Sequence, residues 1–197
     1  MLDRMDFKII YEDNNVLVVD KPAGMIVFNE VVGESEISPF SLVGLLLEKY
    51  PELKNVGKAP RYGVVHRLDK DTSGILLAAK NDKTREFFQK QFQARKVEKK
   101  YIALAVGNLK NNEGVIEGLL GRSPNDRRKQ KVFLPHEPGT EGKRTAETKY
   151  KLLKRFEKYD LIEAEPKTGR KHQIRAHLAY LGHPIACASS LKVQEII

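Results

Sequence analysis

The chain is organised around one stretch, His66-Arg67-Leu68-Asp69-Lys70-Asp71-Thr72-Ser73-Gly74, which is followed by the apolar run Ile75-Leu76-Leu77-Ala78-Ala79. The first part is crowded with charges and turn-forming residues, and the second is typical of a short buried strand. A polar turn that leads into a core strand holds its side chains rigidly while leaving them reachable from a cleft. Asp69 is therefore the first candidate for a functional residue.

Composition indicates a basic globular protein. The chain has 197 residues, of which 41% are hydrophobic, so we expect a single domain over residues 1–197 with a real core. Lys and Arg number 35 against 26 Asp and Glu, which gives a formal net charge of +9. This excess favours a polyanionic partner, nucleic acid above all, although basic surfaces that only confer solubility are common.

Cysteine usage and hydropathy bear on location and cofactors. Cys187 is the single cysteine, so no internal disulfide can form, which suits a reducing cytoplasm. The sequence has no Cys/His cluster with zinc-ligand spacing, and no apolar run near the roughly 20 residues that span a bilayer. The stretch Met1-Leu2-Asp3-Arg4 lacks the apolar region of a signal peptide. We expect a cytoplasmic protein without a metal site, a cofactor or a membrane segment.

Hydrophobic periodicity predicts an α+β fold with a mostly antiparallel sheet and flanking helices. Strands are expected at 7–12, 16–20, 74–79, 99–107, 114–121, 147–152 and 159–166. Helices are expected from an N-cap at Ser38 to Tyr50, after Asn81-Asp82, and over 172–181.

Three further stretches invite interpretation. Phe87 and Phe88 recur at helical spacing, which favours burial in the core over base stacking. The basic stretch 122–131 and the stretch 135–144 are expected to be loops. The basic one is either solvated or grips phosphates, and the sequence favours neither.

Asp69 and Asp71 raise the question of paired carboxylates, which would suit glycoside hydrolysis. Residues i and i+2 of an extended chain point to opposite faces, so Asp71 is better explained as a turn residue. Local chemistry alone favours a turn-capping role for Asp69 over a catalytic one, since Asp in turns is mostly structural. Arg175 is either a surface arginine or a bidentate partner that keeps a buried carboxylate ionised. Tyr101 either packs in the core or stacks on a base.

His66 and His172 are the histidines nearest these candidates. Each has the chemistry of a general base, but histidines in such positions are more often structural hydrogen-bonders, and we favour that interpretation.

Three segments, in chain order, resemble the motifs of the RluA-type RNA pseudouridine synthases. Residues 66–74 resemble the aspartate motif HRLDxxTSG, and Lys100-Tyr101-Ile102-Ala103 resembles the tyrosine motif. Residues 167–178 (KTGRKHQIRAHL) resemble the third motif, and residues 20–24 (DKPAG) fit the early turn of the family. The likeness spans about residues 7 to 185.

The resemblance implies the pseudouridine synthase fold, a mixed and mostly antiparallel sheet with a central catalytic cleft. It implies isomerisation of uridine to pseudouridine in structured RNA, ribosomal or transfer, by a monomer that uses no metal or cofactor. Asp69 would be the catalytic carboxylate, Arg175 its ionic partner, and Tyr101 would stack on the target base. Arg67 would help to fill the gap left by the flipped uridine. Further RNA contacts are expected from His66, Lys100, Arg170, Lys171 and His172.

The chain departs from the family pattern in three places. Lys171 stands where the family usually has a small hydroxyl residue. After His183-Pro184-Ile185 the family continues with Gly-Asp and a Tyr-Gly turn, whereas this chain reads Ala186-Cys187-Ala188, so we expect the final core strands to be missing. We expect no separate RNA-binding domain before residue 7. The alternative function is therefore a non-catalytic RNA-binding or RNA-folding protein on the same fold. Whether Asp69 attacks the base, attacks the sugar or assists proton removal stays open.

Overall fold

The structure is a computed structural model that describes residues 6–29, 37–126 and 128–186. The chain divides into two compact units, Met1–Lys96 and Val97–Ile197. Each unit has its own hydrophobic core. The predicted departure at Cys187-Ala188 lies outside the described residues.

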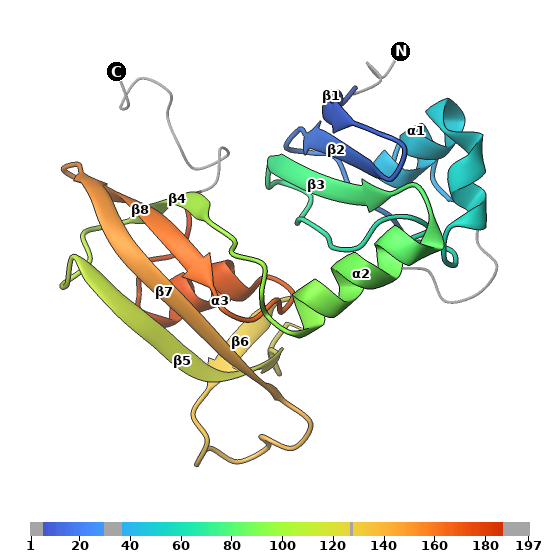
Figure 1. Ribbon diagram of the computed structural model, residues 1–197. Coiled ribbons are helices and arrows are strands. Elements are labelled where there is room, and N and C mark those ends of the chain that lie inside the picture. Colours follow the sequence, from blue (N-terminus) through green and yellow to red (C-terminus); the bar gives the residue numbers. More distant parts are fainter. Residues whose placement is uncertain (1–5, 30–36, 127, 187–197) are drawn as a thin grey trace. The chain divides into compact units, whose positions relative to one another are not determined.

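The first unit is built on a three-stranded antiparallel sheet in the order β1-β2-β3, shown in blue to green in Figure 1. Its strands are β1 (Lys8–Glu12), β2 (Val16–Lys21) and β3 (Gly74–Ala79), each within a residue or two of the predicted bounds. Leu17 and Val19 of β2 and Leu76 and Ala78 of β3 are fully buried, because alternate residues of a strand face the same side.

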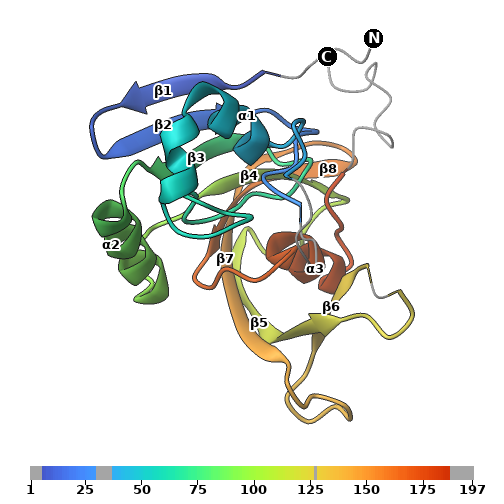
Figure 2. The same cartoon turned by 90° about the vertical axis from the view of Figure 1, so that its right-hand side faces the viewer.

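Two α-helices and a short 3₁₀ helix complete the first unit. They are α1 (Leu42–Lys49), η1 (Pro51–Asn55) and α2 (Asp82–Gln93). Helix α1 buries its apolar face in the same core as β2 and β3 (Figures 1 and 2). The predicted N-cap at Ser38 is wrong, because Ser41 Oγ accepts from the amide of Gly44 at 3.1 Å and caps α1. The predicted cap at Asn81 is confirmed.

Helix α2 corrects one prediction about burial. Phe87 is 57% exposed, and no residue of α2 is buried. Phe88 is half-buried and meets Phe87 edge-on, with their ring centroids 5.7 Å apart. The expected burial of Phe87 in the core is therefore wrong. Aromatic spacing marks one side of a helix, but it does not supply a partner to cover that side.

The second unit is a five-stranded antiparallel sheet in the order β4-β8-β7-β5-β6, with helix α3 packed against it (Figure 1). Its elements are β4 (Tyr101–Val106), β5 (Glu113–Arg122), β6 (Gln130–Phe133), β7 (Arg144–Arg155), β8 (Tyr159–Pro166) and α3 (Gln173–Tyr180). The α+β class with antiparallel pairing is confirmed, in two sheets rather than one. The loop predicted over 122–131 is partly wrong, since Gln130 begins β6.

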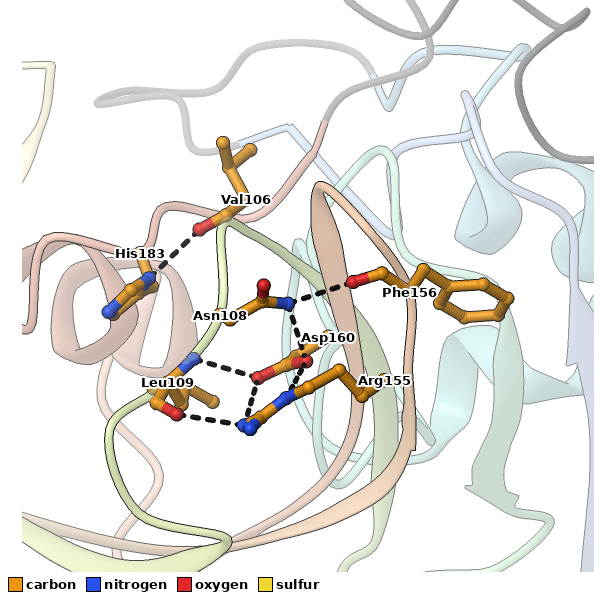
Figure 3. Close-up of polar contacts among 7 residues, drawn as sticks. All are labelled: Val106, Asn108, Leu109, Arg155, Phe156, Asp160 and His183. Atoms are coloured by element: carbon orange, nitrogen blue, oxygen red, sulfur yellow. Dashed lines mark hydrogen bonds and ion pairs between the residues drawn. The ribbon is translucent and has the colours of Figure 1, made fainter.

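A buried carboxylate ties the β7–β8 hairpin to the loop that follows β4 (Figure 3). Asp160 is fully buried and accepts from Leu109 N at 2.7 Å, from Asn108 Nδ2 at 3.0 Å, and from Nε and Nη2 of Arg155 at 3.0 Å each. Burial alone would raise the pKa of Asp160, but these hydrogen bonds outweigh it and lower the pKa. The carboxylate therefore stays charged and fixes the hairpin.

Within the described ranges, the helices are all too short or too polar to cross a bilayer.

Candidate active site

The predicted catalytic turn begins at Asp69, which is half-buried at the end of an extended segment. Its carbonyl oxygen accepts from the amide of Thr72 at 3.1 Å, which closes a turn that includes the exposed Asp71. Gly74 then starts β3 with a φ of 128°, a conformation that side-chain-bearing residues rarely adopt. The structure thus places Asp69 on a short turn fixed to a core strand, as the sequence predicts.

A buried lysine hydrogen-bonds to the backbone of this turn. Lys21 is fully buried, and its Nζ donates to the carbonyl oxygens of Pro22 (2.7 Å), Met25 (2.8 Å) and Lys70 (3.1 Å). Gly24 also donates its amide to the Lys70 carbonyl, at 2.9 Å. The peptide group between Lys70 and Asp71 is therefore held by two donors, one from the last residue of β2 and one from the segment that follows it.

Burial lowers the pKa of Lys21, and the negative charges of Asp71 and Asp69 oppose that effect. The Lys21 ammonium therefore lies within electrostatic reach of both carboxylates. Sequence reasoning missed this role. The only local signal is a lysine at the end of an apolar strand, where a charge needs partners.

His66 makes structural contacts within the first unit. Its Nε2 accepts from the amide of Leu77 in β3 at 3.0 Å, so that nitrogen carries no proton. Its ring stacks on Phe92 of α2, with the centroids 4.9 Å apart. Both contacts agree with the structural interpretation of the sequence, and the predicted RNA contact of His66 stays a prediction.

The guanidinium of Arg67 packs on an aromatic ring. Its guanidinium carbon is 4.9 Å from the centroid of Phe28, and that of Arg61 is 5.2 Å from the same centroid. The predicted insertion of Arg67 into the space of the flipped base stays a prediction.

In the second unit, Gln173 organises the third motif. Its side chain is 4% exposed and fully bonded: Oε1 accepts from Thr168 Oγ1 (2.7 Å) and Arg170 N (3.0 Å). Nε2 donates to Glu147 O and Thr148 Oγ1, both at 2.9 Å. One amide therefore joins the turn before α3 to strand β7, and the sequence analysis assigned it no role.

The other predicted residues of the third motif lie within three residues of Gln173. His172 is the N-cap of α3 and has a left-handed backbone with a φ of 53°, a strained conformation for a non-glycine residue. Arg170 Nε donates to Thr145 O at 3.1 Å. Lys171 and Arg175 are exposed on either side of the helix start.

The tyrosine motif lies beside the third motif. Tyr101 begins β4, is half-buried and packs on the core of the second unit. Lys99 Nζ donates to Thr168 O at 3.4 Å, which joins the two motifs. Lys100 is exposed, with its Nζ 3.5 Å from Glu163 Oε1. Two of the three motifs are thus brought together, and the predicted pairing of Asp69 with Arg175 stays a prediction.

His177 of α3 is a buried histidine that the sequence analysis did not single out. It is fully buried, and neither ring nitrogen has a hydrogen-bond partner among the described residues. Burial lowers its pKa to about 4, so it is neutral at physiological pH.

Within the part of the chain that the structure describes, no three His, Cys, Asp or Glu side chains converge on a common point that would hold a metal ion.

Comparison with known proteins decides the family. Residues 15–180 match the family described as RNA pseudouridylate synthase. The chain belongs to this family. The RluA-type resemblance is confirmed, since several relatives named ribosomal large subunit pseudouridine synthase D share 35 to 42% of aligned residues with it.

Individual relatives are similar over most of this chain. An uncharacterized RNA pseudouridine synthase, YlyB, of Bacillus subtilis is 37% identical over 189 residues, which cover 94% of this chain and 58% of the relative. A ribosomal large subunit pseudouridine synthase D of Borreliella burgdorferi is 42% identical over 182 residues, covering 90% and 52%. The chain therefore spans little more than half the length of these relatives.

A solved structure agrees with the fold. Human RNA pseudouridylate synthase domain containing 4 superposes with a TM-score of 0.70 at 26% identity, and the match covers 90% of this chain and 66% of that one.

Proposed function

We propose that this pseudouridine synthase family member isomerises uridine to pseudouridine in structured RNA, with Asp69 as the catalytic carboxylate. The observation that carries the proposal is the immobilised turn at Asp69, because the Lys21 ammonium and the Gly24 amide both hold the Lys70 carbonyl. A carboxylate carried by such a fixed turn is preorganised for catalysis.

The other motif residues complete the site in this proposal. The guanidinium of Arg175 pairs with Asp69 and keeps it ionised. The ring of Tyr101 stacks on the target uracil. Arg67 occupies the space that the uracil leaves. Both units together then form the catalytic domain.

The chemistry needs a dry pocket and an everted base. The N1–C1′ bond breaks, the uracil turns without leaving, C5 bonds to C1′, and the C5 proton is lost while N1 gains one. Extruding a stacked base costs a few kcal/mol. Phosphate contacts from a chain with a net charge of +9 can offset that cost.

The substrate in this proposal is ribosomal or transfer RNA, and the active species is a cytoplasmic monomer. Relatives that bear the name ribosomal large subunit pseudouridine synthase D favour ribosomal RNA. Lys100, Arg170, Lys171 and His172 are the proposed RNA contacts of the second unit, and His66 is that of the first.

Mapping pseudouridine in unmodified RNA tests the proposal. Ribosomal and transfer RNA transcripts are incubated with the purified chain, and pseudouridine is then located by chemical mapping. We expect new pseudouridine at one or a few defined positions. RNA binding without any new pseudouridine would instead favour the alternative, a non-catalytic RNA-binding protein on the same fold.

A further inference from the structure

Two arginines share one buried aromatic ring in the first unit. The guanidinium carbons of Arg61 and Arg67 lie 5.2 and 4.9 Å from the centroid of Phe28, whose side chain is 5% exposed. Stacking on a ring face orients a guanidinium without using its N–H donors. The ring therefore helps to fix where each guanidinium group lies.

Arg61 is presented by a tightly bonded turn. The amides of Arg61 and Tyr62 donate to the Lys58 carbonyl at 3.1 and 2.9 Å. Tyr62 has a φ of 46°, which costs energy for a bulky residue and persists only where the surroundings enforce it. At the start of the turn, a Cβ on Gly57 would lie 2.8 Å from the Tyr62 carbonyl oxygen. The backbone that carries Arg61 is thus fixed by close packing.

The donors of Arg61 have no acceptor within the described part of the chain. Its side chain is exposed and contacts the ring of Phe28. Lys58, in the same turn, is exposed as well. A planar guanidinium fork matches the oxygens of a phosphate.

This arginine pair lies next to the catalytic turn. The segment that carries Phe28 begins at Gly24, whose amide bonds the Lys70 carbonyl, and Met25 shares the Lys21 ammonium with that carbonyl. Arg67 precedes Asp69 by two residues.

We propose that Arg61 binds a backbone phosphate of the substrate RNA beside the nucleotide that enters the site. The inference rests on the proposed function, and it adds both a residue and a ligand class, the phosphodiester, to it. Phe28 is the positioning residue, because its ring orients both guanidinium groups. The contact would hold the backbone of the everted nucleotide while its base is turned.

The salt dependence of RNA binding tests this inference. Each phosphate contact contributes about 0.7 to 0.9 to the slope of log K against log salt concentration. The probe is a fluorescently labelled RNA stem–loop with uridines in its loop. In Arg61→Gln we expect that slope to fall by about that amount, and the affinity at low salt to fall about tenfold. Lys54→Gln, which removes an exposed positive charge from η1 in the same unit, is the matched control and should keep the wild-type slope.

Two further variants separate charge from geometry. Arg61→Lys keeps the charge but lacks the planar fork, so it should keep the slope and lose affinity. Phe28→Leu keeps both arginines but removes the ring. Combined with Arg61→Gln it should cost less than the two separate effects together, because the ring acts through Arg61. Thermal unfolding of each variant shows whether it is folded.

The outcomes are distinct. Equal slopes and affinities for Arg61→Gln and the wild-type chain, or an equal loss in Lys54→Gln, would overturn the phosphate site even if the chain makes pseudouridine. Strict additivity of Phe28→Leu and Arg61→Gln would remove Phe28 from the site. A wild-type chain that makes no pseudouridine would overturn the proposed function, while the slope comparison would still decide the phosphate site.

Discussion

Replacing Gln173 by Met removes four hydrogen bonds with little change in side-chain length. Glu147 O keeps a partner, because Lys167 N also donates to it at 3.0 Å. Thr148 Oγ1, Thr168 Oγ1 and Arg170 N each lose their bond to the glutamine, and the two hydroxyl residues are buried. At roughly 1 kcal/mol or more for each buried group left without its partner, the loss is about 3 to 4 kcal/mol.

This loss is smaller than the roughly 5 to 15 kcal/mol by which an ordinary domain is stable, so the variant should still fold, with its melting temperature lowered by roughly 10 °C. The same amide also fixes the backbone of the turn before Arg175. The kcat of pseudouridine formation should therefore fall, even at a temperature where the variant is folded.

Circular dichroism melts and single-turnover assays measure the two effects. Gln93→Met, on the exposed side of α2, is the matched control and should change neither. A Gln173→Met chain that melts within about 2 °C of the wild type would refute the hydrogen-bond reasoning. A destabilised chain with an unchanged kcat would refute the positioning role alone.

Three other changes test the structure. Lys21→Met leaves three carbonyl oxygens short of a donor, and we expect about 2 kcal/mol less stability in urea unfolding and slower pseudouridine formation. Burial holds the pKa of His177 at about 4 against 6.5, so only the unfolded chain gains a proton between these values. Stability should therefore fall by about 3 kcal/mol as pH drops from about 6.5 to about 4, and His177→Leu should flatten that part of the urea-unfolding profile. Asp160→Asn removes the counter-charge of the half-exposed Arg155 and should cost about 2 kcal/mol at neutral pH. Because folding lowers the pKa of Asp160, that difference should shrink as pH falls below about 3.8.

Local patterns were sufficient wherever neighbours in sequence determine the structure. Strand β2, the apolar run of β3 and the cap at Asn81 depend on residues within a few positions of one another, and all were predicted. The prediction of the α1 cap was wrong because Ser38 and Ser41 are equally good N-cap candidates by residue type. Only the geometry shows that the hydroxyl of Ser41 bonds the Gly44 amide.

The missed residues depend on partners that are distant in sequence. Lys21 bonds a carbonyl 49 residues away, and Gln173 bonds strand β7 at 25 and 26 residues. No periodicity records such pairings, because they form only after the sheets are built. Strand β6 was missed for the same reason: Gln130–Phe133 is a strand through its pairing with β5. The motif match could identify Asp69, but not the buried cation that fixes its turn.

The most direct test of the catalytic role of Asp69 is tritium release from RNA labelled at uracil C5. Asp69→Asn keeps the size of the side chain and removes its charge, so RNA binding and its salt dependence should persist. We predict that the wild-type chain releases tritium and that the Asp69→Asn chain releases none above background. Undiminished release from the Asp69→Asn chain would contradict the role assigned to this carboxylate.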